Sequence, residues 1–321
     1  MATANINITA AELHNTAVKY GEMLLTTVYK KAQEYLTHFL PIPGVQGSVI
    51  LPSMDVNFEF GPYDANYKDT DPVEIGERVL EVFLGSAQKD LDFNKIALEV
   101  YGDMKIQGEE MKNTEIAKKV LFVMAARLGK ALGLSIFNAE RNPSGHKTKD
   151  LYNGYDSIAA AEVLKGTIAE GTNMHQFKEA ITNVNAVKLL KEFYRSAPWE
   201  LREMELEMFL DPEILEAYKE DFQTTHAGLI YNDKYDQTVL EGSAGKCKLV
   251  GLPSKSGSKF IQLAPRGVMV YGYGDKLPGE KIEVEKFSTF LTTFGAACRF
   301  GAEYRTLDKK WIRFGKLYEA A

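Results

Sequence analysis

The stretch most like a nucleotide-binding motif runs from Gly242 to Cys247 and contains a Gly-Lys pair. A phosphate-binding loop also needs a glycine five residues before the glycine of that pair, and a Ser or Thr after the lysine to hold magnesium. Leu240 and Cys247 occupy those two positions. We therefore expect a turn that leads into a strand.

A second glycine-rich stretch, Tyr271 to Asp275, reads Tyr-Gly-Tyr-Gly-Asp. It lacks the G-x-G-x-x-G spacing of dinucleotide-binding folds. The Pro278-Gly279 pair that follows is typical of a turn. We expect a hairpin connection between two strands here.

The residues that could bind zinc or act as nucleophiles are too widely spaced to form a local motif. No histidine stands three or four residues from another or beside a cysteine, as zinc sites require. The five histidines are His14, His38, His146, His175 and His226. No G-x-S-x-G or H-E-x-x-H sequence occurs. We predict no catalytic residue, no metal site and no cofactor, and hence no enzymatic activity.

Composition is ordinary for a globular protein, with 45% hydrophobic and 26% charged residues among 321. The net charge of −6 argues against strong non-specific binding to duplex DNA, which needs clustered Lys and Arg. Cys247 and Cys298 are the only cysteines and are expected to be buried free thiols. No apolar run reaches membrane-spanning length, and the N-terminus does not resemble a signal peptide. We expect a protein made in a cytoplasm, with no membrane partner.

The first predicted element is a long N-terminal helix. Thr9 to Glu12 forms a capping box, and apolar residues then recur at steps of three and four. Pro41 and Pro43 are expected to end the helix. A helix of this kind ahead of any sheet suits an arm that lies along a surface.

Residues 47–84 read as two long strands around a polar tip. Met54 to Phe60 alternate apolar and polar side chains, residues 61–72 carry turn chemistry, and residues 73–83 run back. An isolated two-stranded hairpin is only marginally stable in water. The hairpin must therefore lie on the rest of this chain or on a neighbouring copy.

The remainder of the chain mixes helices and strands, which makes α+β the expected class. A helix is predicted from Asn113 or Thr114 to near Asn138, and another around residues 186–197. Asp211-Pro212 should cap and start a further helix after a strand at 205–210. Later strands are expected at 246–250, 259–264, 267–272, 280–287 and 311–314.

Four stretches resemble the major capsid proteins of tailed bacteriophages, in particular those of phages and prophages of Bacteroides-like hosts. They are Leu-Pro-Ser-Met-Asp-Val-Asn-Phe-Glu-Phe-Gly-Pro-Tyr from Leu51, Leu-Tyr-Asn-Gly-Tyr-Asp from Leu151, Met-Phe-Leu-Asp-Pro-Glu from Met208 and Val-Met-Val-Tyr-Gly-Tyr-Gly from Val268. The order of arm, hairpin, long helix, mixed lobe and β-rich end is also similar. The resemblance implies the Hong Kong 97-like α+β fold, with a long spine helix.

The resemblance also implies a division of the chain by role. Residues 1–46 would be an N-terminal arm, 47–84 the extended hairpin loop, 145–265 an axial domain, and 85–144 with 266–321 a peripheral domain. The implied function is a structural subunit that assembles as hexamers and pentamers into an icosahedral phage head around double-stranded DNA. Portal, scaffolding or decoration proteins would be further partners. The virion would be its location, after assembly in the host bacterial cytoplasm.

The hairpin tip, residues 61–72, is the predicted contact with a neighbouring subunit. Two tyrosines offer amphipathic area and three charged side chains can pair across an interface. These candidate contact residues are Tyr63, Tyr67, Lys68, Asp69 and Asp71. Two alternatives stay open on the sequence: an encapsulin-type compartment shell, and a soluble α+β enzyme whose site is not local in sequence.

Overall fold

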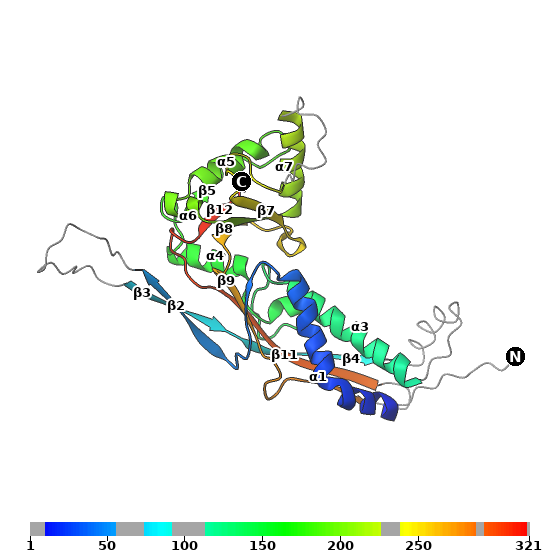
Figure 1. The fold of residues 1–321 in the computed structure, drawn as a ribbon. Helices are drawn as coiled ribbons and strands as arrows, with labels where there is room; N and C mark the ends of the chain where they lie inside the picture. The colour runs from blue at the N-terminus through cyan, green and yellow to red at the C-terminus, as the bar shows by residue number, and fades with distance from the viewer. Residues whose placement is uncertain (1–9, 56–73, 92–112, 226–237, 287–291, 320–321) are drawn as a thin grey trace, which may run out of the picture. The chain divides into compact units, whose positions relative to one another are not determined.

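The computed structural model describes residues 10–55, 74–91, 113–225, 238–286 and 292–319 (Figure 1). The chain forms two compact units, each built from segments far apart in sequence. Unit 1 comprises Met1–Gly47, Val82–Gly154 and Gly272–Gly301, and unit 2 comprises Ser48–Glu81, Tyr155–Tyr271 and Ala302–Ala321. Each unit contains both helices and strands, so the predicted α+β class is confirmed.

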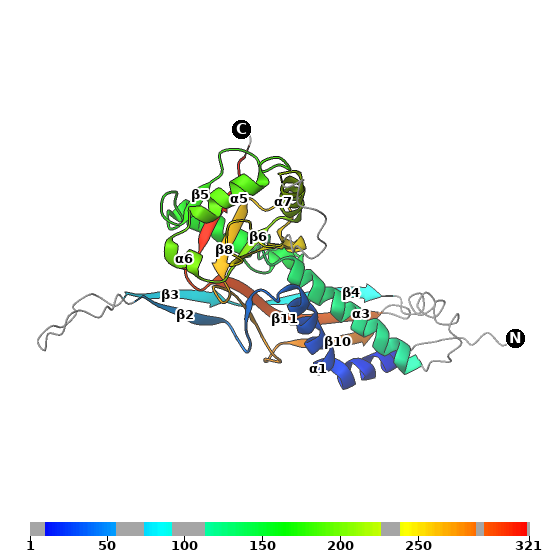
Figure 2. The same ribbon diagram turned by 45° about the horizontal axis from the view of Figure 1, so that its top comes forward.

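Two long helices, α1 (Ala10–Tyr35) and α3 (Asn113–Leu134), pack side by side in unit 1 (Figures 1 and 2). They approach closely because α3 carries Gly129 at the crossing. A Cβ atom on Gly129 would lie 2.2 Å from the carbonyl oxygen of Val28. The predicted N-terminal helix is therefore packed within its own unit, on α3 and on strand β10.

Helix α1 ends earlier than predicted. It stops at Tyr35, and the two prolines expected to end it instead flank or lie within a short strand, β1 (Leu40–Ile42). Leu36 and Phe39 are buried between the two elements and close the turn by backbone hydrogen bonds. The stop is thus set by a tight turn with buried apolar side chains rather than by proline.

The first five-stranded sheet belongs mainly to unit 1. Its order is β1-β9-β11-β10, and β4 also pairs with β11. The further strands are β4 (Phe83–Leu91), β9 (Met269–Tyr273), β10 (Lys281–Lys286) and β11 (Thr292–Tyr304). Strand β11 separates β9 from β10, so the predicted hairpin between those two strands is wrong. The residues between β9 and β10 therefore connect two strands that are not neighbours in the sheet, because β11 lies between them.

The predicted hairpin is present as β2 (Ser48–Asp55) and β3 (Glu74–Glu81), which pair antiparallel in full register (Figure 2). Its first strand begins at Ser48, before the alternating stretch that predicted it. Pro52, within β2, stands opposite Glu77. Residues 56–73, including the tip, lie outside the described residues.

Unit 2 is built on a second five-stranded sheet of order β5-β12-β8-β6-β7. Its strands are β5 (Met174–Gln176), β6 (Leu206–Leu210), β7 (Cys247–Gly251), β8 (Phe260–Pro265) and β12 (Arg313–Lys316). β6 runs parallel to β7 and antiparallel to β8. The sheet is therefore mixed, and its strands at 206–210, 247–251 and 260–265 match those predicted to within two residues.

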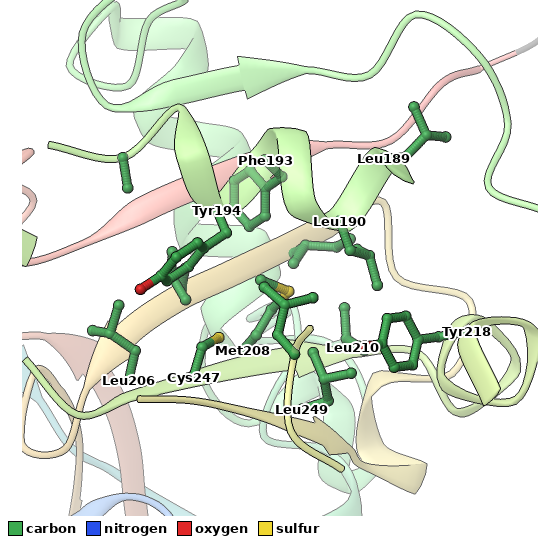
Figure 3. Close-up of a cluster of buried hydrophobic side chains, with 14 of the residues drawn as sticks. Leu189, Leu190, Phe193, Tyr194, Leu206, Met208, Leu210, Tyr218, Cys247 and Leu249 are labelled. Atoms are coloured by element: carbon green, nitrogen blue, oxygen red, sulfur yellow. The ribbon is translucent and has the colours of Figure 1, made fainter. Parts of the chain in front are cut away.

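Helices of unit 2 cover this sheet and enclose an apolar core. They are α4 (Tyr155–Lys165), α5 (Ala186–Arg195), α6 (Trp199–Glu203) and α7 (Pro212–Thr225); short 3-10 turns η1 (Thr148–Asp150, in unit 1) and η2 (Pro253–Lys255) complete the chain. Phe193 from α5, Met208 from β6 and Tyr218 from α7 meet in the core (Figure 3). Two helices and a strand thus share one hydrophobic cluster.

The predicted cap of α7 is confirmed. Asp211 accepts a hydrogen bond from the backbone N–H of Glu213 at 3.0 Å through Oδ1. Its other oxygen accepts the backbone N–H of Gly257 at 2.6 Å. The carboxylate therefore satisfies a donor of the first helical turn and also holds the loop before β8.

Candidate assembly surfaces

The hairpin has one covered face and one exposed face. Leu51 and Leu80 are buried, whereas Ile50 and Val79 are 56% and 46% exposed. Ile50 and Val79 stand directly opposite each other, so they form one apolar pair on the exposed face. Because side chains alternate along a strand, the exposed Glu77 and Glu81 lie on the same face as Val79. This face therefore presents an apolar centre flanked by carboxylates.

Arg78 fixes the base of the hairpin within unit 2. Its Nη2 atom lies 2.8 Å from Oε1 of Glu303 at the end of β11 and 3.4 Å from Oε1 of Glu162 in α4. Nε of Arg305 also donates to the carbonyl oxygen of Pro52 at 3.4 Å. Side chains from outside the hairpin therefore hold both of its strands in place. No local sequence pattern predicts these contacts.

The two carboxylates that hold Arg78 titrate differently. Burial raises the pKa of Glu303, and the charge of Arg78 only partly offsets this. Burial also acts to raise the pKa of Glu162, but hydrogen bonds from Thr167 and Lys165 and the charge of Arg78 outweigh it, so that pKa is lowered. Glu162 is therefore the more strongly stabilised anion of the two.

All five predicted contact residues of the tip lie outside the described residues. They are Tyr63, Tyr67, Lys68, Asp69 and Asp71, within the undescribed residues 56–73. Their contact with a neighbouring subunit stays a prediction. The described strands establish only where the tip is attached, beyond Asp55 and before Glu74.

The Gly-Lys stretch is a turn, as predicted. The backbone N–H of Ser243 donates to the carbonyl of Leu240 at 3.3 Å, and that of Lys246 donates to Ser243 at 3.1 Å. Gly242 and Gly245 adopt φ values of 81° and 82°, in the left-handed region that glycine tolerates. The chain then enters β7 at Cys247.

Both cysteines are free and lie in strands, Cys247 in β7 and Cys298 in β11. Burial raises the pKa of each thiol to about 12. Because the thiolate is the reactive form, both side chains are unreactive at neutral pH. The prediction of buried free thiols is confirmed for Cys247, whereas the residue Cys298 is only partly buried.

Unit 2 contains a buried polar network that no sequence pattern predicted. Lys255 is fully buried, and its Nζ lies 3.1 Å from Oδ1 of Asp156 and 2.9 Å from Oγ of Ser258. Gln262 donates to the same Asp156 oxygen at 2.8 Å. Burial lowers the pKa of Lys255, and the adjacent carboxylate opposes that shift. The network links η2, α4 and β8 and so holds these three elements in position.

Within the described part of the chain, no three His, Cys, Asp or Glu side chains come together as a metal site would require. None of the described helices has the length and apolar character to cross a membrane.

No protein-family model and no curated protein matches this sequence. Solved structures do match its fold. The capsid of a native GTA particle matches with a TM-score of 0.58 at 12% identity, over 90% of this chain and 91% of that one. A chain of the satellite phage P4 procapsid, which includes the size determination (Sid) protein, gives 0.57 at 11% identity, over 92% and 90%.

The capsid of Myoviridae phage XM1 gives a TM-score of 0.50 at 10% identity, covering 89% of this chain and 92% of that one. At these identities the likeness establishes the fold and nothing finer. The fold is the α+β fold of Hong Kong 97-like capsid proteins, as the sequence resemblance predicted.

Proposed function

We propose that this chain is a structural major capsid protein that assembles, through hexamers and pentamers, into an icosahedral phage head around double-stranded DNA. The observation that carries the proposal is the fold match over 90% of this chain and 91% of a capsid chain. A match over nearly the full length of both leaves little of the chain for a separate enzymatic domain. The role is structural rather than catalytic.

The hairpin supports the same proposal. Its exposed face carries the apolar pair Ile50 and Val79, which would be buried by a neighbouring subunit in a shell. The predicted parts then take their roles: 1–46 as arm, 47–84 as extended loop, 145–265 as axial domain, and 85–144 with 266–321 as peripheral domain. Portal, scaffolding or decoration proteins would complete the particle.

The finer assignment is to phages or prophages of Bacteroides-like hosts, with assembly in the bacterial cytoplasm and a final location in the virion. It rests on the four sequence stretches that begin at Leu51, Leu151, Met208 and Val268.

Expression of the full chain tests the proposal. We expect closed particles by negative-stain electron microscopy and a large species by sedimentation, with a small pool of free subunits. A chain that stays a folded monomer at high concentration and turns over a metabolite would overturn the proposal.

Packaged DNA would be confined by the shell rather than tightly bound, because the chain carries a net charge of −6. We expect weak binding of free subunits to duplex DNA in a titration at physiological salt. Tight binding that weakens steeply with added salt would contradict this part of the proposal.

The tip can be tested by deletion. Replacing residues 61–72 with an Asn-Gly turn should leave the subunit folded, because a two-residue turn suits an antiparallel hairpin, and should impair particle formation. Single alanine changes in the tip should cost little, except that a tyrosine anchor would contribute about 1–3 kcal/mol to assembly. Normal particles with unchanged thermal stability would exclude the tip as an assembly contact.

A further inference from the structure

Charge is unevenly distributed along this chain, although its net charge is −6. Helix α3 carries four Lys and Arg residues against one acid, and no Asp or Glu occurs from Lys118 to Ala139. Arg127 and Lys130 stand three residues apart on this helix, a spacing at which like charges repel each other. The exposed face of α3 therefore concentrates positive charge at a cost to the stability of the helix.

Helix α1 lies beside α3 in unit 1 and adds further cations (Figures 1 and 2). Nζ of Lys118 lies 4.4 Å from the centre of the Tyr20 ring, and Gly129 packs against Val28, so the two helices run in the same direction. Residues near position 30 of α1 thus lie level with residues near position 130 of α3. We call this exposed surface the helix-layer face, and its cations are Lys19, Lys30, Arg127 and Lys130.

The carboxylates of α1 do not neutralise the helix-layer face. Glu34 pairs with Lys31 at 2.7 Å, and Glu22 pairs with Lys276 at 3.0 Å. Among the described residues, none of the four cations of the face forms an ion pair with a carboxylate. The face therefore keeps an excess of positive charge that its own unit leaves unbalanced.

We propose that the helix-layer face contacts the phosphate backbone of duplex DNA. The proposal rests on the proposed function, and it assigns the contact with enclosed DNA to one particular surface. Lys19 and Lys30 lie about 16 Å apart along α1, at about 1.5 Å per residue. One DNA strand presents a phosphate about every 3.4 Å along the duplex axis, so the face spans several phosphates.

Duplex DNA matches this face better than a protein partner does. The cores of protein interfaces are depleted in charge, and aromatic side chains often supply their main anchors. As far as α1 and α3 are described, their exposed large apolar side chains are Val18, Met23 and Val123, and none of them is aromatic. Lysine and arginine side chains, in contrast, are the groups that most often contact DNA phosphates.

The contact is weak for one subunit and is strengthened by the number of copies in a shell. Four cations release few counterions, and the chain as a whole is acidic, so free subunits bind DNA weakly at physiological salt. Many copies of the face acting on one DNA molecule bind it far more strongly than a single copy does. The proposal therefore agrees with the weak binding expected of free subunits.

The salt dependence of DNA binding by free full-length subunits tests the proposal. Fluorescence anisotropy follows the binding of a labelled duplex of about 30 base pairs, between about 20 and about 150 mM salt. R127Q with K130Q should reduce the slope of log affinity against log salt by about 2, and should lower the affinity at the lowest salt by at least about tenfold. Duplexes of unrelated sequence should behave alike, because phosphate contacts carry no sequence information.

The matched control is K188Q with K248Q. Both lysines are exposed and lie in unit 2, so this variant removes the same charge from a surface outside the helix-layer face. The control should keep the wild-type slope. Equal losses in the two double variants would show that net charge alone sets the affinity, and would overturn the proposal. So would the absence of measurable wild-type binding at the lowest salt.

Chemical labelling of particles provides a second test. An amine-acylating reagent is applied to DNA-filled and to emptied particles, and the labelled peptides are quantified by mass spectrometry. Labelling of Lys30 and Lys130 should be at least about threefold lower in filled particles, because phosphates cover these amines, whereas labelling of Lys188 should not change. Equal labelling of Lys30 and Lys130 in the two kinds of particle would contradict the proposal.

The outcomes separate this proposal from the proposed function. If shells form and the DNA-binding slope is the same for all variants, the helix-layer face is not a DNA contact and the capsid role stands. If R127Q with K130Q lowers particle yield but leaves DNA binding unchanged, the face contacts protein and the proposal is wrong. If the slope changes as expected but no shell forms, the DNA contact stands and the capsid role fails.

Thermal melts of the free subunits check that each variant is folded. If the double variant melts early, the single changes R127Q and K130Q replace it. Each should then reduce the slope by about 1, and an unchanged slope in both would overturn the proposal.

Discussion

The central strands of the two five-stranded sheets differ in how their own unit covers them. In β8 of unit 2, the first five of the six residues are buried. Because side chains alternate between the two faces of a strand, buried side chains lie on both faces of β8. In β11 of unit 1, Thr292, Phe294 and Phe300 are buried, but the residues between them are partly exposed. Strand β8 is therefore buried on both faces, whereas residues 295–299 of β11 are only partly buried on either face.

The difference lies in the side chains that pack on each sheet. In unit 2, α5 and α7 pack on the sheet through the apolar cluster, and Gln262 of β8 donates a hydrogen bond to Asp156 of α4. In unit 1, the partly buried small residues Gly295 and Ala297 of β11 stand opposite Gln88 and Ser86 of β4. We therefore expect substitutions at buried positions of unit 2 to act mainly on folding and substitutions at exposed apolar positions to act mainly on assembly.

The largest effect should come from the core of unit 2. Replacing Phe193 with Ala removes a fully buried ring from the cluster in Figure 3 and should cost about 3–5 kcal/mol of unfolding free energy. Chemical denaturation of free subunits measures it. The control V184A, at a side chain 77% exposed, should change stability by less than about 0.5 kcal/mol. Equal effects at the two positions would contradict the closed core.

The helix crossing of unit 1 gives a matched pair of glycine changes. Replacing Gly21 with Ala adds a Cβ whose nearest neighbour, the carbonyl oxygen of Ile282, is 3.7 Å away, so it should stabilise α1 by about 0.5–1 kcal/mol. The same change at Gly129 places the Cβ 2.2 Å from the carbonyl oxygen of Val28 and should destabilise the unit by about 1–3 kcal/mol. Thermal melts compare the two. A stabilising G129A would show that α1 and α3 are not held in close contact.

The Arg78 cluster predicts opposite pH responses at its two acids. The pKa of Glu162 is lowered from 4.5, so its carboxylate contributes stability above that pH and loses it as pH falls through the folded pKa. E162Q should therefore cost about 1–2 kcal/mol at pH 7, and the difference from wild type should shrink below pH 4.5.

Glu303 provides the control for that titration. Its pKa is raised, so its contribution is fully present below the unfolded value of 4.5 and is lost as pH rises through the folded pKa. The difference between wild type and E303Q should therefore move in favour of wild type as pH falls. Parallel pH profiles for the two variants would show that Arg78 does not bind them as described.

The smallest effect on folding should occur on the exposed hairpin face. Replacing Ile50 and Val79 with Ser should change unfolding free energy by less than about 0.5 kcal/mol per site but should impair particle formation. L80A, at the buried position beside Val79, should instead cost about 2–4 kcal/mol. Normal assembly of the double Ser variant would remove this face from the contact surface.

The sequence predicted those elements that have a strong hydrophobic periodicity or that are bounded by clear turn or capping residues. The hairpin, the cap at Asp211 and the later strands at 247–251 and 260–265 all follow such signals. It missed β4 and β11, which pair with each other. Both are rich in small residues, such as Gly85 and Ala87 in β4 and Gly295 and Ala297 in β11, so neither shows the apolar alternation of a half-covered strand.

The candidate site was predictable only in part. The hairpin itself followed from local pattern, but its anchor did not. Arg78 meets Glu162 and Glu303, which lie 84 and 225 residues further along the chain. Contacts at such separations depend on the packing of α4 and β11, and one sequence carries no local trace of them.

Pro52 has a consequence for the isolated chain. A two-stranded ribbon exposes backbone groups along both outer edges. A proline within β2 removes an N–H donor from that strand, and Glu77 opposite it adds a charge. Strands of other polypeptides therefore meet an interrupted edge. The edge of the hairpin is therefore less able to pair with strands of other chains and to start aggregation.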